Sequence, residues 1–108
     1  MSFGTDARLE FNLGEAKVDT TEKAIKAIHK IMYMGRATAS ALALRMVRGL
    51  VVPQARKDSQ RVMMFITDGM SNIGGPSQKE AKRLREKKNF EIYAIGKKVH
   101  LPQSCKLI

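Results

Sequence analysis

The sequence predicts an α/β domain with an open, mainly parallel sheet and helices on both faces. Residues 61–67 and 90–95 form two short, almost continuously apolar runs, a pattern typical of strands buried on both faces of a parallel sheet. Segments with helical periodicity alternate with these runs, which also favours a parallel α/β sheet. With 108 residues the chain can form at most one small domain. We assign residues 1–100 to this domain and residues 101–108 to a C-terminal tail.

The N-terminal residues predict a β-hairpin. Residues 7–13 place Leu9, Phe11 and Leu13 on one side and polar side chains on the other, which is typical of a half-exposed strand. Phe3 would end a preceding strand, and the intervening residues would form a tight turn.

Two helices are expected next. The first, over residues 19–32, would begin at Asp19, and Glu22 would complete a capping box. We expect its apolar stripe to face the core; the stripe consists of Ala24, Ile25, Ile28, Ile31 and Met32. The second helix, over residues 38–50, would begin at Thr38, whose hydroxyl can cap free amides.

A loop and a third helix separate the two apolar runs. Residues 68–76 hold three glycines and predict a loop. Ser77 and Glu80 have the spacing of a capping box, which predicts a helix from Ser77 to about Lys88. The basic residues of this helix are most simply a solvated face. Gly96 is expected to end the second apolar strand.

The net charge of +10 is large for a chain of this size. A basic surface favours heparin-like polyanions, acidic proteins, nucleic acid or anionic membranes. The six aromatic residues are not interleaved with basic groups, so specific nucleic-acid binding by stacking is not expected. No apolar run is long enough to span a bilayer. Neither histidine has a partner at a spacing typical of nucleophilic catalysis, so no catalytic residue is assigned.

Two oxygen-bearing residues stand where α/β folds place their ligands. Asp68 follows the first apolar run and Thr38 begins a helix, and ligands gather at the carboxyl ends of strands in open sheets. Hydroxyl and carboxylate oxygens suit Mg²⁺. Spacing alone favours a simpler interpretation, in which Thr38 caps its helix and Asp68 shapes a turn.

Four segments in order carry a more specific pattern. Residues 66–75 end a strand in Thr-Asp-Gly and continue with Ser-Asn and glycines. Residues 33–42 contain a tyrosine, a turn and a threonine that opens an alanine-leucine helix, and residues 90–96 form a strand that ends in Ala-Ile-Gly. Together with a hairpin over residues 2–13, these segments resemble a von Willebrand factor type A domain, and the similarity covers about residues 2–100.

The resemblance implies a Rossmann-like fold and a metal-ion-dependent adhesion site that holds Mg²⁺. Thr38 and Asp68 match the family's metal-ligating threonine and aspartate, and Ser40 or Ser71 would support them only indirectly. In the family, an acidic side chain of the partner protein completes the metal shell. The family's Asp-x-Ser-x-Ser motif is absent, as are its first strand, last strand and final helix. We therefore expect an incomplete domain, truncated at both ends, with weak metal binding by this chain alone.

The leading prediction is a protein-binding module of extracellular adhesion or matrix, secreted and without enzymatic activity of its own. One alternative is a regulatory type A domain of a complement-type serine protease. Another is a metal-independent module that binds polyanions or proteins, which the charge and the absent motif both favour.

Overall fold

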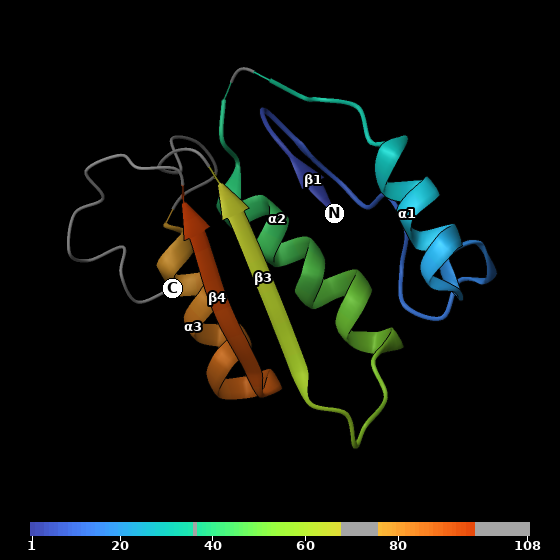
Figure 1. Cartoon of the computed structure of the whole chain (residues 1–108). Coiled ribbons are helices and arrows are strands. Elements are labelled where there is room, and N and C mark those ends of the chain that lie inside the picture. The colour runs from blue at the N-terminus through green and yellow to red at the C-terminus, as the bar shows by residue number, and fades with distance from the viewer. Residues whose placement is uncertain (36, 68–75, 97–108) are drawn as a thin grey trace.

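The computed structural model describes residues 1–35, 37–67 and 76–96, and Figure 1 shows how their elements are arranged. The described strands form two separate two-stranded sheets, an antiparallel pair β1–β2 and a parallel pair β3–β4. Helices α2 and α3 lie side by side behind the parallel pair in Figure 1. The parallel α/β arrangement that the sequence predicts is therefore confirmed. No helix in these three ranges is long and apolar enough to cross a membrane.

The N-terminal hairpin is present but is shorter than predicted. Strand β1 (Ser2–Phe3) pairs antiparallel with strand β2 (Ala7–Arg8). The predicted strand over residues 7–13 is wrong beyond Arg8. Asn12 instead uses its amide to donate to the carbonyl oxygen of Leu50, and its backbone N–H donates to the carboxylate of Glu15. Side-chain and turn contacts of this kind replace a strand ladder.

Helix α1 (Thr21–His29) is shorter than the expected 19–32 and follows a 3₁₀ turn, η1 (Ala16–Val18). The capping residue is Thr20, whose hydroxyl accepts a 3.3 Å bond from the backbone N–H of Lys23. The predicted Asp19–Glu22 box is therefore wrong, because Asp19 pairs with the Lys23 ammonium instead.

The sequence predicted that the apolar stripe of α1 faces the core, and this prediction is wrong. No residue of α1 is buried, and Ile25 and Ile28 are about half exposed, at 49% and 54%. Met32 beyond the helix is also exposed. Within the described residues the stripe is only partly covered, since Ala24 and Ile31 are half-buried. The sequence pattern therefore identifies an apolar face but not how much of it is covered.

Helix α2 (Ser40–Met46) continues into a π-helical turn, η2 (Val47–Val51), and a 3₁₀ turn, η3 (Val52–Gln54). Thr38 does not cap it: the N-cap residue is Ala39, which has no side chain able to accept a hydrogen bond. The predicted helical region over residues 38–50 is thus largely present, and its buried side includes Ala41 and Leu44.

The main core lies between the parallel strands and the two helices behind them. Strand β3 (Arg61–Thr67) matches the predicted 61–67, and β4 (Phe90–Gly96) runs parallel to it in register from Arg61↔Phe90 to Thr67↔Gly96. Helix α3 (Ser77–Lys88) has the predicted bounds. The buried cluster of this core consists of Leu44, Phe65, Ala81, Leu84 and Phe90.

Only one face of the parallel pair is covered in the described residues. Met63 and Phe65 point toward the helices, whereas Val62, Met64 and Ile66 are more than half exposed. The prediction that these strands are buried on both faces is therefore wrong for this structure. A continuous apolar run does not reveal which of its two faces is covered, because both sets of side chains are apolar.

Candidate functional site

The predicted residue Thr38 lies at the carboxyl end of the parallel strands. It lines a cleft of about 780 Å³ together with Thr67 at the end of β3 and Gly96 at the end of β4. Asp68 directly follows Thr67 in the sequence but lies outside the described residues, as does Ser71. Ser40 is buried at the start of α2. The cleft is thus at the sheet edge where α/β folds bind ligands.

The β1–β2 hairpin positions the segment that carries Thr38. The backbone N–H of Ala39 donates a 2.7 Å hydrogen bond to the carbonyl oxygen of Gly4. Gly4 is buried, and a Cβ atom there would lie 2.8 Å from the carbonyl oxygen of Gly35 and 2.9 Å from the Cβ of Met34. Only glycine allows the hairpin turn and the loop before Thr38 to come this close together. The turn therefore holds that loop in place.

Gly35 allows the loop before Thr38 to turn. Its φ of +54° belongs to the left-handed region, which glycine adopts at little cost. Tyr33 lies against it, since a Cβ on Gly35 would be 3.3 Å from the tyrosine ring. The rest of the tyrosine is open to solvent, with 94% of the residue exposed. An apolar rim of Met32 and Tyr33 therefore stands beside the cleft.

The described donors meet only part of a cation's needs. Thr38 and Thr67 line the cleft. Each carries a hydroxyl oxygen, which is a hard donor suited to Mg²⁺. Across residues 1–35, 37–67 and 76–96, no three His, Cys, Asp or Glu side chains gather as a metal cluster would require. Since Mg²⁺ takes about six oxygens, any cation here depends on Asp68, on water and on donors from elsewhere.

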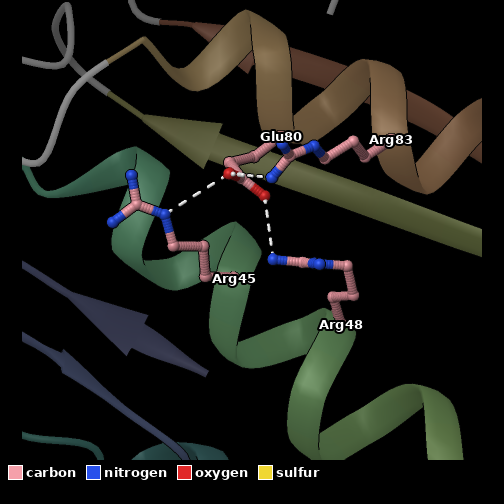
Figure 2. A network of polar contacts seen from close by, with 4 residues as sticks. All are labelled: Arg45, Arg48, Glu80 and Arg83. Atoms are coloured by element: carbon pink, nitrogen blue, oxygen red, sulfur yellow. Dashed lines mark hydrogen bonds and ion pairs between the residues drawn. The ribbon is translucent and has the colours of Figure 1, made fainter.

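A polar network between α2 and α3 was not predicted from the sequence. Glu80 of α3 is buried and contacts three arginines, as Figure 2 shows. Its carboxylate oxygens lie 3.4 Å from Arg45 Nε, 3.4 Å from Arg48 Nη2 and 3.1 Å from Arg83 Nη1. The capping box assigned to Ser77 and Glu80 is therefore wrong, because Glu80 joins α3 to α2 and η2 instead.

A sequence signal for this network was available. Ser77, Glu80, Ala81 and Leu84 follow helical spacing and are all buried, so Glu80 lies within the core-facing stripe of α3. A carboxylate in such a stripe requires cationic partners. Which cations supply them depends on the packing of α2 against α3, which the sequence does not give.

Comparison with known proteins agrees with this fold. The sequence profile of the von Willebrand factor type A domain matches residues 1–107. Two structures of proximal thread matrix protein 1 from the mussel byssus are similar to this chain, each with a TM-score of 0.78 and 29% sequence identity over 87% of this chain. One of them is described as having a zinc-occupied MIDAS motif. No curated protein matches the chain.

The matched region covers 24% and 25% of the two byssus structures, so this chain spans about a quarter of their length. The profile match extends over nearly the whole chain, and the order of elements and the sheet-edge cleft agree with it. The chain therefore belongs to the von Willebrand factor type A domain family.

Proposed function

We propose that this chain is a protein-binding module of the adhesion type, in which a divalent cation at the carboxyl edge of β3 receives an acidic side chain of the partner. The observation that supports this is that Thr38 lines the same cleft as Thr67, the residue that directly precedes Asp68. Thr38 would bind the cation through its hydroxyl oxygen and Asp68 through its carboxylate.

The cation supplies one kind of chemistry when it is bound: it attracts an anionic oxygen of the partner by electrostatic force. Mg²⁺ is the cation that hydroxyl and carboxylate oxygens favour. The zinc described for the byssus protein makes Zn²⁺ the second ion to test. The matrix origin of that relative supports a location outside the cell.

Titration with Mg²⁺ tests the proposal. We expect the backbone amide resonances of Thr38 and Asp68 to shift as Mg²⁺ rises to millimolar concentrations. The variant Thr38→Val should weaken this response, whereas Thr21→Val, an exposed threonine at the start of α1, should leave it unchanged. A folded chain whose amides do not respond to Mg²⁺ or Zn²⁺ would exclude a functional metal site.

A second function, metal-independent binding of a heparin-like polyanion, has its own supporting observation. Among the described residues, the carboxylate of Glu80 contacts three arginines, so this region is rich in guanidinium groups. The side chains of these arginines, which come from α2, η2 and α3, are each 40–45% exposed. Guanidinium groups held in a fixed position suit the planar recognition of sulfate groups.

Heparin affinity measured with and without EDTA separates the two functions. A polyanion site predicts affinity that falls steeply with added salt and is indifferent to EDTA. Arg83→Gln should elute from heparin at lower salt than Arg8→Gln, which removes an equal charge from the hairpin. Equal elution of the two variants would show that only net charge matters.

A further inference from the structure

The positive charge of the described residues is unevenly distributed. Residues 1–35, which form the hairpin and α1, carry five acidic and five basic side chains and are therefore balanced. Residues 37–67 and 76–96, which form α2, η2, α3 and the parallel strands, carry eleven basic and four acidic side chains. A polyanion is therefore attracted to one half of the molecule rather than to its whole surface.

Three basic residues form a row along α3. Lys79, Arg83 and Lys87 are spaced by four residues, so they lie along one face of the helix over a length of about 12 Å. Both lysines are exposed, and neither forms an ion pair with another described residue. Glu86 of the same helix lies 3.8 Å from Lys82, which is outside the row. Like charges at this spacing repel, and a bound anion would relieve the repulsion.

Arg48 extends this α3 basic row onto η2. Its Nη2 lies 3.4 Å from the carboxylate of Glu80, and Arg83 Nη1 lies 3.1 Å from the same carboxylate, so Glu80 holds the two guanidinium groups close together (Figure 2). The Glu80 side chain is 6% exposed, whereas those of Arg48 and Arg83 are 40% and 41% exposed. Guanidinium groups fixed in this way lose little conformational freedom when they bind an anion.

We propose that a linear sulfated polysaccharide binds along the α3 basic row and contacts Arg48 beside it. This inference rests on the polyanion-binding function proposed above, and it adds where the ligand lies and what shape it has. A linear chain of repeated anionic groups can contact cations spread over about 12 Å at the same time, and each contact after the first is intramolecular. A compact anion reaches fewer of these cations. The balanced half of the molecule, with α1, would remain free.

Two matched double variants test the position of the ligand. One combines Lys79→Gln with Lys87→Gln; the control combines Lys26→Gln with Lys30→Gln and removes an equal charge from α1 and its C-cap. All four lysines are exposed, so neither variant is expected to unfold the chain. A size-defined heparin oligosaccharide is titrated in EDTA at several NaCl concentrations. The α3 variant should bind about tenfold more weakly at physiological salt, with a salt slope reduced by about two. The control should remain close to the unchanged chain.

NMR of the unchanged chain locates the ligand independently of any substitution. The oligosaccharide should shift the amide resonances of α3 and η2 more than those of α1. Equal weakening in the two double variants, or shifts concentrated on α1, would overturn the proposed row while leaving polyanion binding intact. No binding of heparin to the unchanged chain in EDTA would instead reject the polyanion function itself, and the row with it.

Two further probes test the shape of the ligand. Inositol hexakisphosphate, a compact polyanion, should bind more weakly than the oligosaccharide, and equal affinity would overturn the linear site. Vesicles containing phosphatidylserine test a membrane surface. If the α3 variant lost binding to these vesicles but kept its affinity for heparin, the row would belong to a membrane surface and the proposal would fail.

Discussion

The backbone N–H of Ala39 donates a 2.7 Å hydrogen bond to the carbonyl oxygen of Gly4, and this bond joins the hairpin turn to the start of α2. The two residues are far apart in the sequence; Gly4 lines the cleft together with Thr38, the residue that directly precedes Ala39. The hairpin thus positions the segment that carries Thr38 through a backbone hydrogen bond, and we assign no metal ligand to it.

Gly4→Ala is expected to destabilise the chain and to weaken any Mg²⁺ response at Thr38. The added methyl would meet the backbone of Gly35 at 2.8 Å, so the loop must move, at a cost of about 1–3 kcal/mol in unfolding free energy. Gly49→Ala is the control, because nothing lies within 4 Å of its Cβ position and alanine favours helix by about 1 kcal/mol. Urea unfolding of both variants checks this; equal stabilities would contradict it.

Glu80→Gln should lower the unfolding free energy by about 3 kcal/mol, since it removes a buried carboxylate that contacts three arginines. The matched control is Glu86→Gln, also on α3. That carboxylate is exposed and lies 3.8 Å from Lys82 Nζ, a pair worth about 0.5 kcal/mol. The pair of variants is compared by urea unfolding. A loss at Glu80 no larger than that at Glu86 would mean that the network does not hold α3 to α2.

Ile28→Gln should change stability by less than about 0.5 kcal/mol, because this side chain lies on the uncovered face of α1. Leu84→Ala is the contrasting variant: the leucine is fully buried, and the cavity should cost about 2–5 kcal/mol. Thermal unfolding monitored by circular dichroism distinguishes the two. A large loss at Ile28 would show that α1 packs against the domain in solution.

Asn89 ends α3 in the left-handed conformation, with φ of +53° and ψ of +45°. Asn89→Ala should destabilise the helix end by about 1 kcal/mol, because a Cβ without a local polar group is unfavourable there. Asn89→Gly should be neutral or slightly stabilising, since glycine adopts this region freely. Hydrogen exchange of the last amides of α3 reports the difference; faster exchange in the glycine variant than in the alanine variant would refute it.

Local patterns predicted some elements closely and others poorly. The bounds of β3 were confirmed because a bounded apolar run carries a strong local signal. The bounds of α3 were also confirmed, although the Ser77–Glu80 capping box from which they were predicted does not form. The prediction that the strand continues beyond Arg8 was wrong, since an alternation of apolar and polar residues does not by itself supply a pairing partner. For the site, the sequence singled out Thr38 and Asp68; the structure describes only Thr38, and it adds Thr67 as a neighbour.

The sequence by itself determined the α/β class, the type A family pattern and the order of its elements, because these follow from hydrophobic periodicity and short motifs along the chain. Tertiary structure alone decided which apolar faces are covered and which three arginines meet Glu80. Those properties depend on contacts between residues far apart in the chain. The sequence shows which residues are apolar or charged, but the partner of each residue is determined only when the elements pack against one another.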